Sequence, residues 1–301
     1  MSLLVTGSIG IDSVETPHGR AEGVLGGSSV YFSLAASLFT EVRLVGVVGE
    51  DFDMRMFKPL KGKPIDTRGV EIRDGSKTFR WQGKYTGAMN EAETLDVELN
   101  VLSECGAEIP PEFADTDYVF LANTHPALQR GFARQFPNAK LIVSDTMDIW
   151  IRKETDELRR LLSAVHGLVL NEIEARLLTG QGNLVAAGLE ILKMGPRFTV
   201  IKKGEHGSLL VAHDDLCVLP AYPTLKTIDP TGCGDTFAGA MMGYLAAQGR
   251  HDPHALRSAM ARGSIVSSFV IESFSVQALA AVTTEDIERR LERLQAIARF
   301  E

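Results

Sequence analysis

Short apolar segments rich in β-branched residues alternate with amphipathic segments along most of this 301-residue chain. The apolar segments predict buried strands at residues 3–6, 42–48, 118–122, 141–144, 167–170, 198–202 and 208–212. A helical period between them predicts helices at residues 30–39, 53–60, 127–135, 153–163, 173–178 and 184–193. Near-continuous apolar strands that alternate with helices indicate a mainly parallel sheet covered by helices on both faces. We therefore predict the α/β class, with a three-layer α/β/α core.

Two early segments interrupt this alternation and lack a helical partner. Residues 11–25 are polar and contain glycine, and residues 70–99 contain KTFRWQGKYTGA, which is typical of short strands joined by a turn at Gly83. The simplest arrangement is a small β-sheet that projects from the core and closes over a ligand as a lid. We expect one domain over residues 1–301 with this lid inserted in it. Beyond Asp235 the pattern predicts helices at residues 236–248, 253–268 and 284–300.

The composition excludes several classes of partner. A net charge of −8 argues against nucleic acid or an anionic membrane surface as the main partner, although a local loop can still bind a small anion. No segment is long and apolar enough to span a bilayer, and the first residues lack the pattern of a signal peptide. Three widely spaced cysteines indicate a reducing compartment. We therefore expect a cytoplasmic protein that acts on a small molecule.

The stretch IDPTGCGDTFAGA at residues 228–240 combines a glycine-rich turn with the start of a predicted helix. Backbone N–H groups in such a turn, together with the helix dipole, can converge on an anion. The amides of Gly232, Cys233 and Gly234 are therefore candidates for an anion hole. Asp235 is either a base that accepts a proton from a substrate hydroxyl or a simple N-cap. The spacing differs from that of the Walker A loop.

Other polar residues lie where an α/β sheet places its ligands. Asp12 follows the first strand, so it is a candidate contact for the substrate, although a turn or cap role is open. Asn171 and Glu174 stand three residues apart at a strand–helix junction, where they can share a helix face. An N-cap Asn with a solvated Glu is the alternative for this pair. Asp145 follows another strand and is either a further ligand contact or a simple turn residue.

Lysines and aromatic residues provide two further groups of candidates. Lys202 and Lys203 end a predicted strand, where a lysine either contacts a ligand or is simply a charge at the surface. Phe79 and Trp81 flank Arg80 in the second lid segment. Their rings can stack on a base or a bulky substrate, or they can pack the lid onto the core or onto a second copy of the chain.

Six stretches, in order and over essentially the whole chain, resemble the motifs of the PfkB/ribokinase family of small-molecule kinases. DPTGCGDTFAGA is similar to the C-terminal signature of that family. The other five are GSIGID, LGGSSVYFSLAASLF, VGVVGEDFDMRMF, LVLNEIEARLLTG and VIKKGEHGSLL. The resemblance implies a ribokinase-like fold with a β lid, ATP and Mg²⁺ as cofactors, and transfer of the γ-phosphate to a hydroxyl group.

The resemblance also implies a role for individual residues. By motif match, Asp235 is the catalytic base, and the amides of Gly232, Cys233 and Gly234 form the anion hole. The residues expected to bind the nucleotide are Asn171, Glu174, Lys202, Lys203, Gly204, Gly207, Gly263 and Ser267. Glu174 is expected to contact Mg²⁺ through water. The residues expected to bind the acceptor substrate are Asp12, Gly26, Gly27, Tyr31 and Trp81.

The sequence departs from the family at two polar positions, which counts against a simple pentose. Tyr31 stands where the family commonly has an Asn that binds the substrate, and Gly10 stands where ribokinases often have another Asn. We expect a sugar or sugar-like substrate, with a nucleoside kinase of the same family as the alternative. A catalytically silent nucleotide-binding protein is an alternative of another class, which the intact Asp235 argues against. Family lids often form dimer interfaces, so a homodimer through the lid is also an expectation.

Overall fold

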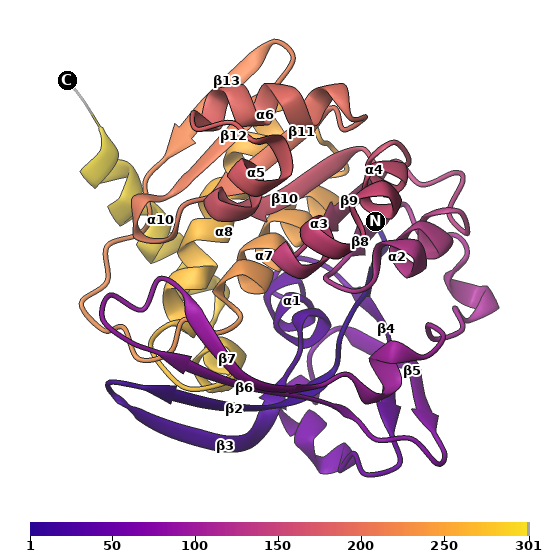
Figure 1. Cartoon of the computed structure of the whole chain (residues 1–301). Helices are drawn as coiled ribbons and strands as arrows, with labels where there is room; N and C mark the ends of the chain where they lie inside the picture. Colours follow the sequence, from indigo (N-terminus) through magenta and orange to yellow (C-terminus); the bar gives the residue numbers. More distant parts are fainter. Residues whose placement is uncertain (300–301) are drawn as a thin grey trace.

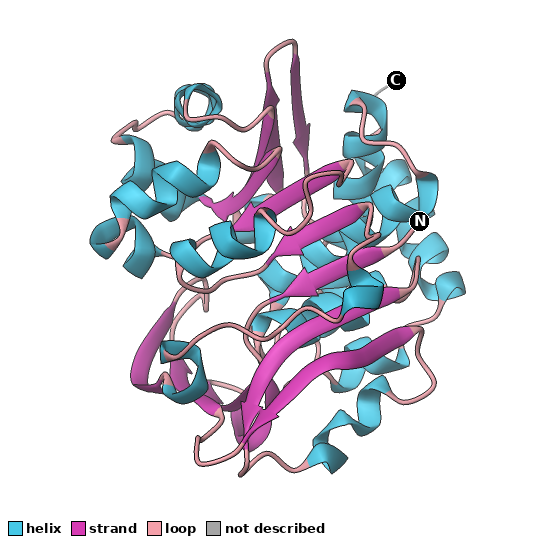
Figure 2. Ribbon diagram, turned by 90° about the vertical axis from the view of Figure 1, so that its right-hand side faces the viewer, coloured by secondary structure: helices cyan, strands magenta, loops and turns pink. Residues whose placement is uncertain are grey.

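A nine-stranded sheet forms the centre of the computed structural model, which describes residues 1–299. Neighbouring strands are parallel from β11 to β5, and the β12–β13 hairpin adds two antiparallel strands at one edge (Figures 1 and 2). The predicted mainly parallel sheet is thus confirmed. In sheet order the strands are β13 (Asp215–Leu219), β12 (Ser208–Ala212), β11 (Phe198–Lys202), β10 (Gly167–Asn171), β9 (Leu141–Asp145), β8 (Tyr118–Leu121), β1 (Leu3–Thr6), β4 (Val42–Gly49) and β5 (Ile65–Arg73).

Helices cover both faces of this sheet, as Figure 2 shows. Successive residues of one strand supply opposite faces: Leu3 and Val5 join one hydrophobic core, and Leu4 joins the other. Because both faces are buried, the strands have nearly continuous apolar sequences. The first core includes residues from α1 (Ser28–Ala36), α7 (Cys233–Gln248), α8 (Pro253–Val270), α9 (Gln277–Ala281) and α10 (Thr284–Ala298). The second includes residues from α2 (Pro126–Ala133), α3 (Asp148–Lys153), α4 (Thr155–Leu162), α5 (Glu172–Thr179) and α6 (Leu184–Lys193).

Some of the predicted helices differ in extent or type. Residues 54–60 form a 3₁₀ helix that contains Pro59, a residue that cannot donate a backbone hydrogen bond. The helix predicted at residues 284–300 ends at Ala298, and residue 300 lies outside the described residues. Helices α3 and α9 were not predicted, because each is too short to show a clear period.

A second, four-stranded sheet lies beside the carboxyl ends of the large sheet's strands (Figure 1). Its order is β3 (Gly19–Gly26), β2 (Gly10–Thr16), β6 (Phe79–Tyr85) and β7 (Ala92–Glu98), and we call it the lid sheet. The second insertion, predicted at residues 70–99, begins too early, since β5 occupies residues up to Arg73 and pairs with β4 in the large sheet. The polar sequence of β5 concealed it, because only one of its residues is fully buried.

Helices α1 and α7 pack with their backbones in direct contact. A Cβ atom on Gly239 of α7 would lie 2.3 Å from the carbonyl oxygen of Phe32 in α1, so only glycine allows this approach. The two helices begin at the same cavity, α1 directly after Gly27 and α7 directly after Gly232. This packing therefore fixes two helix N-termini relative to each other.

Candidate active site

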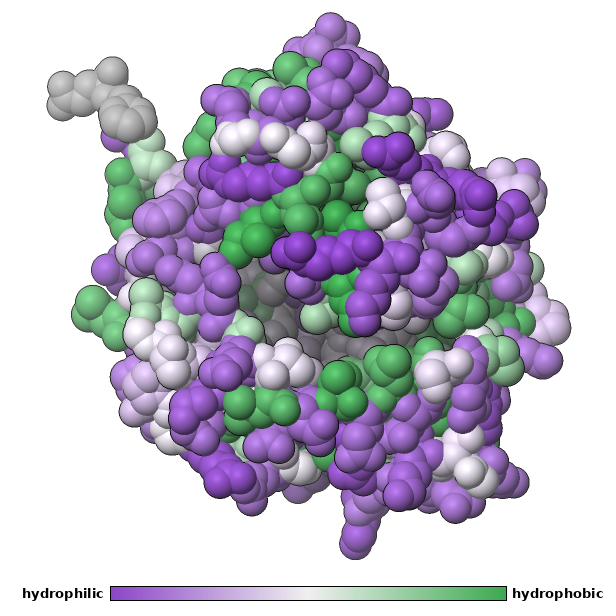
Figure 3. Space-filling model, in the orientation of Figure 1, coloured by the Kyte–Doolittle hydropathy of each residue, from purple (hydrophilic) through white to green (hydrophobic). Residues whose placement is uncertain are grey.

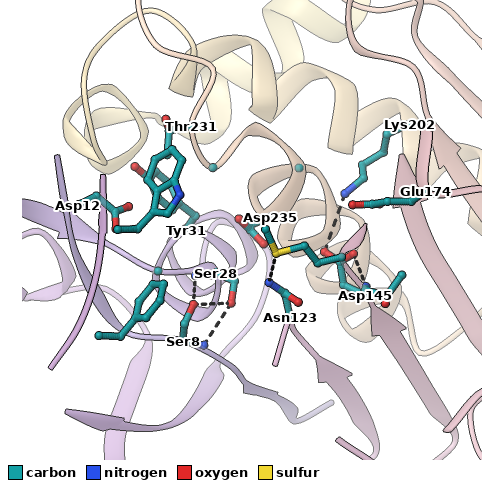
Figure 4. Close-up of a pocket in the computed structure, with 17 residues that line it drawn as sticks. Ser8, Asp12, Ser28, Tyr31, Asn123, Asp145, Glu174, Lys202, Thr231 and Asp235 are labelled. Carbon is teal, nitrogen blue, oxygen red and sulfur yellow. Dashed lines mark hydrogen bonds and ion pairs between the residues drawn. The ribbon is translucent and has the colours of Figure 1, made fainter. Parts of the chain in front are cut away.

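A cavity of about 270 Å³ lies between the carboxyl ends of the large sheet's strands and the lid sheet. The space-filling view shows the surface hollowed between these two parts (Figure 3). The cavity brings together most of the predicted site residues, and Figure 4 shows several of them pointing into it. Its lining consists of Ser8, Asp12, Gly27, Ser28, Tyr31, Phe79, Trp81, Asn123, Asp145, Thr146, Met147, Glu174, Lys202, Thr231, Gly232, Gly234 and Asp235.

The glycine-rich loop leads directly into α7. Gly232 is the N-cap residue, and its φ of 76° lies in the left-handed region that favours glycine. The helix begins three residues earlier than predicted, at Cys233, so Asp235 lies within the first turn. The side chain of Asp235 does not cap the helix, which removes the simple N-cap interpretation. The carboxylate of Asp235 is instead free to act in the cavity.

The three candidate amides of the anion hole differ in their surroundings. The amide of Cys233 donates to the carbonyl oxygen of Pro230 at 3.1 Å, so it already serves the turn. The side chain of Cys233 faces α8, where the hydroxyl of Ser267 donates to the Cys233 carbonyl oxygen at 3.0 Å. Gly232 and Gly234 line the cavity, whereas Cys233 does not. The geometry therefore favours the two glycines as anion donors.

Two of the three aspartates that line the cavity, the buried Asp12 and the half-buried Asp235, have raised pKa values near neutrality. Burial raises the pKa of Asp235 to about 7, and the negative charge of Asp145 adds to the effect. Burial also raises the pKa of Asp12 to about 7, followed by the charges of Asp229 and Asp235. A carboxylate that titrates near neutral pH is suited to exchange a proton with a substrate.

Lys202 ends strand β11 and supplies a positive charge to the same region. Its Nζ lies 3.9 Å from Oδ2 of Asp145, and a Cβ atom on Gly234 would lie 2.8 Å from it. Burial lowers the pKa of Lys202, but the carboxylates of Asp145 and Glu174 outweigh this and hold the pKa above its ordinary value. The ammonium group therefore stands beside the N-terminus of α7, where an anion is expected.

Asn171 and Glu174 form a capping box at the start of α5. The side-chain oxygen of Asn171 accepts from the Glu174 amide at 2.8 Å, and a carboxylate oxygen of Glu174 accepts from the Asn171 amide at 2.7 Å. Asn171 is thus an N-cap residue and lies outside the cavity lining. Glu174 is only 9% exposed and lines the cavity, so the alternative of a solvated Glu is wrong.

The carboxylates of Asp145 and Glu174 fit a partly hydrated Mg²⁺ ion. Burial raises the pKa of both groups, and a nearby cation would favour their ionised forms. Within residues 1–299, no three acidic, histidine or cysteine side chains gather in a metal cage. Mg²⁺ commonly takes one or two carboxylates and completes its shell with water and substrate phosphates, which this arrangement allows.

The acceptor side of the cavity combines a carboxylate with aromatic rings. Asp12 of β2 is paired in register with Trp81 of β6, and Gly26 lies directly against the Asp12 carboxylate. Phe79 and Trp81 both line the cavity from β6. Tyr31 is only 2% exposed and lies between this side and the glycine-rich loop. Polar and flat apolar surfaces thus face one ligand space.

Several residues expected to bind the nucleotide lie outside the cavity lining. The amide of Lys203 donates to the Gly207 carbonyl oxygen at 2.8 Å and closes a short turn around Gly204. Gly263 faces the ring of Phe237 on α7. Ser267 contacts the start of α7 through the Cys233 carbonyl oxygen. The role of Lys203, Gly204, Gly207, Gly263 and Ser267 in nucleotide binding stays a prediction.

Some residues of the cavity lining were not predicted. Ser8 and Ser28 hydrogen-bond to each other at 3.0 Å and lie within two of the quoted motifs. Asn123, Thr146 and Met147 follow strands β8 and β9, so the rule that ligands bind at the carboxyl ends of strands would have found them. Thr231 lies in the glycine-rich loop itself.

The fold and this cavity define a ribokinase-like phosphotransferase. The family model for pfkB family carbohydrate kinases matches residues 31–283, so the chain belongs to this family. It is an enzyme that transfers phosphate to a hydroxyl group. A cytidine kinase of Thermococcus kodakarensis is 31% identical over 261 residues, which cover 84% of this chain and 90% of that protein.

Solved structures with low sequence identity share the fold. A nucleoside kinase of Burkholderia thailandensis in complex with inosine aligns with a TM-score of 0.78 at 19% identity, covering 98% of this chain and 99% of that one. An aminoimidazole riboside kinase of Salmonella enterica aligns with a TM-score of 0.77 at 18% identity, covering 97% and 100% of the two chains. The predicted ribokinase-like fold is confirmed.

None of the helices within residues 1–299 has the length and hydrophobicity needed to cross a membrane. The cytoplasmic location and the homodimer through the lid stay predictions.

Proposed function

We propose that this protein is an ATP- and Mg²⁺-dependent nucleoside kinase that phosphorylates a ribose hydroxyl. The observation that carries the proposal is the acceptor side of the cavity, where the Asp12 carboxylate and the rings of Phe79 and Trp81 face one space. A carboxylate binds hydroxyl groups, and an aromatic ring stacks on a planar base. A nucleoside offers both features in one molecule, whereas a free sugar offers only the hydroxyl groups.

The similarity to a cytidine kinase supports a pyrimidine nucleoside as the first substrate to test. A sugar remains the second candidate, and Asp12 together with the family description supports it. The sugar expectation rested mainly on family frequency, and the rings of Phe79 and Trp81 on the acceptor side now favour a nucleoside.

The residues of the cavity divide the chemistry of phosphoryl transfer between them. Asp235 accepts the proton of the attacking hydroxyl as its oxygen approaches the γ-phosphorus. The amides at Gly232 and Gly234, with the dipole of α7, stabilise the charge that develops on the phosphoryl oxygens. Lys202 adds a positive charge from β11. A Mg²⁺ ion near Glu174 would neutralise part of the charge on the ATP phosphates.

The test is a panel of acceptors with ATP and Mg²⁺, in which both ADP and the phosphorylated acceptor are measured. Cytidine, uridine, inosine and adenosine are compared with ribose and other free sugars. We expect kcat/KM for the best nucleoside to exceed that for ribose by about 10²-fold, the difference that one buried stacking site can supply. A free sugar as the best acceptor would overturn the nucleoside proposal. A panel in which no acceptor leads to ADP formation would show that the acceptor is neither one of these nucleosides nor one of these sugars.

A variant separates the aromatic wall from the rest of the site. Trp81→Ala removes the stacking surface and leaves Asp12 and Asp235 in place. We expect kcat/KM for nucleosides to fall by about 10- to 100-fold, as loss of one base–aromatic stack predicts, with little change for any free sugar that reacts. An equal loss for both acceptor classes would show that Trp81 only packs the lid sheet.

A further inference from the structure

A chain of hydrogen bonds begins and ends on the lid sheet and passes through the glycine-rich loop that leads into α7. The hydroxyl of Thr231 donates to the hydroxyl oxygen of Tyr85, on β6, at 3.3 Å. The Thr231 amide donates to Oδ1 of Asp229 at 2.9 Å. Oδ2 of Asp229 accepts from the Ser275 amide at 3.4 Å, and the Ser275 hydroxyl donates to the Leu25 carbonyl oxygen, on β3, at 2.6 Å. The lid sheet therefore holds the loop that precedes Asp235 from two points.

The two points of attachment lie at different distances from the base of the lid sheet. Leu25 lies at the end of β3, next to the residues where the chain returns to the core. Tyr85 lies at the far end of β6, six residues beyond Phe79, which pairs with the core-side end of β2. At the usual rise of a strand this places Tyr85 roughly 20 Å along β6 from the base. Leu25 is thus placed as a hinge contact and Tyr85 as a remote one.

The surroundings of Tyr85 favour a defined position for its hydroxyl. Its side chain is 8% exposed and packs with Val14 and Met89 in a small hydrophobic cluster. Trp81 and Phe274 pack against the same cluster, and Phe274 belongs to the segment that carries Ser275. The ring therefore stays anchored when the hydroxyl alone is removed, which makes Tyr85→Phe a clean test.

The turn after Tyr85 reaches the nucleotide side as well. A Cβ atom on Gly204 would lie 3.6 Å from the side-chain oxygen of Asn90, which lies between β6 and β7. One hairpin of the lid sheet thus approaches both the glycine-rich loop and the turn around Gly204. Any outward movement of this hairpin must break the Tyr85–Thr231 contact.

We propose that Tyr85 is a positioning residue that holds the lid sheet against the glycine-rich loop. We call its hydrogen bond with Thr231 the latch. With the latch closed, the acceptor space is shielded and the glycine-rich loop is aligned with the acceptor. With the latch broken, water reaches the γ-phosphorus more often. A water oxygen then bonds to phosphorus as the bond to ADP breaks, and its protons pass to solvent, which yields ADP and inorganic phosphate. The proposal rests on the family's phosphotransfer activity and does not require that the acceptor be a nucleoside.

The first test compares Tyr85→Phe with the control Tyr244→Phe. Tyr244 lies on α7, where its ring packs against Arg262 with 4.0 Å between the guanidinium carbon and the ring centre. A hydrogen bond contributes about 0.5–1.5 kcal/mol, so its loss should raise the open population about 2- to 12-fold. We expect amide exchange in residues 79–98 to quicken by that factor in Tyr85→Phe and to stay at the wild-type rate in Tyr244→Phe. Unchanged exchange in Tyr85→Phe would overturn the latch.

The second test measures coupling with the best acceptor of the wild-type enzyme. We expect the ratio of ADP to phosphorylated acceptor to rise in Tyr85→Phe and in Thr231→Val, and to stay at the wild-type value in Thr231→Ser, which keeps the hydroxyl. The double variant should be no worse than either single variant, because both remove the same bond. Additive losses would contradict the latch. If the wild type phosphorylates no nucleoside, the proposed substrate class is wrong. The amide exchange rates of the variants then still test the latch.

Discussion

The ring of Tyr31 lies directly against Gly232, so that a Cβ atom at position 232 would stand 2.4 Å from Cδ1 of that ring. Glycine is therefore required at this position for two separate reasons, the close approach of the ring and the φ of 76°. The contact joins the start of α7 to a residue of α1 that borders the acceptor space. The position of the glycine-rich loop thus depends on Tyr31, which stands where the family commonly has Asn.

Gly232→Ala is expected to lose activity far beyond its loss of stability. The added methyl group must displace either the Tyr31 ring or the loop, so we expect kcat to fall at least about tenfold, in line with the loss of a donor to the transition state. Gly249→Ala is the matched control, because Gly249 ends the same helix with a φ of 65° far from the cavity. Both variants should lose about 1 kcal/mol of stability from the positive φ. Equal kcat values in steady-state assays of the two variants would contradict this account.

Lys202 and Lys203 are adjacent, but only Lys202 lines the cavity. We expect Lys202→Met to raise the KM for ATP about tenfold or more, because a charge-assisted contact to phosphate is lost. Lys203→Met should change this KM less than Lys202→Met does, by less than about twofold, because the Lys203 side chain lies outside the cavity lining. The measurement is the KM for ATP of each variant at saturating acceptor. The reverse order of effects would assign phosphate binding to Lys203.

The rate at low substrate concentration should depend on pH near neutrality. Asp235 must be ionised to accept a proton, and burial raises its pKa to about 7. We therefore expect kcat/KM to fall as the pH drops below about 7, with an acidic limb that reports the free enzyme. Lys202 lowers the pKa of Asp235, so Lys202→Met should move this limb to higher pH. A profile that is flat from well below pH 7 would contradict a base that titrates near neutrality in the free enzyme.

Asp235→Asn should trade activity for stability. Loss of a general base predicts a fall in kcat of about 10²- to 10⁴-fold, with ATP binding retained. Because the folded pKa is raised from 3.8 to about 7, the wild-type carboxyl contributes stability at low pH that is lost as the pH rises through about 7. An amide does not ionise, so the Tm of the variant should exceed that of the wild type at pH 8, and the difference should shrink at pH 5. Thermal melts at these two pH values check the sign.

The strands buried on both faces were predictable, and the edge strands were not. Residues 3–6 are buried throughout, so their sequence shows no polar interruption. In β13 half-buried and exposed positions alternate at the edge of the sheet, and β5 is partly exposed along most of its length. Their sequences therefore lack the apolar run that indicates a strand in a parallel sheet.

The cavity was predictable where one short motif supplies its residues. Asp235, Gly232 and Gly234 are adjacent in sequence, so local pattern places them together. The start of α7 was missed by three residues, because glycine is a poor helix former and hides the first turn. The contributions of Asn123 and Met147 depend on how separate strands are ordered in the sheet, which no local pattern contains.

The backbone contact between α1 and α7 has a consequence for how this enzyme can acquire new substrates. Tyr31 on α1 and Asp235 on α7 are held at a fixed separation by this contact. Substitutions cannot readily weaken it, because position 239 is already glycine and has no side chain to shorten. In the lid sheet, by contrast, Phe79 and Trp81 lie on β6. This strand pairs with β7, which is exposed along its whole length. When this enzyme is selected for a different acceptor, we therefore expect the first substitutions on β6. The two helices should keep the distance from acceptor to phosphate unchanged.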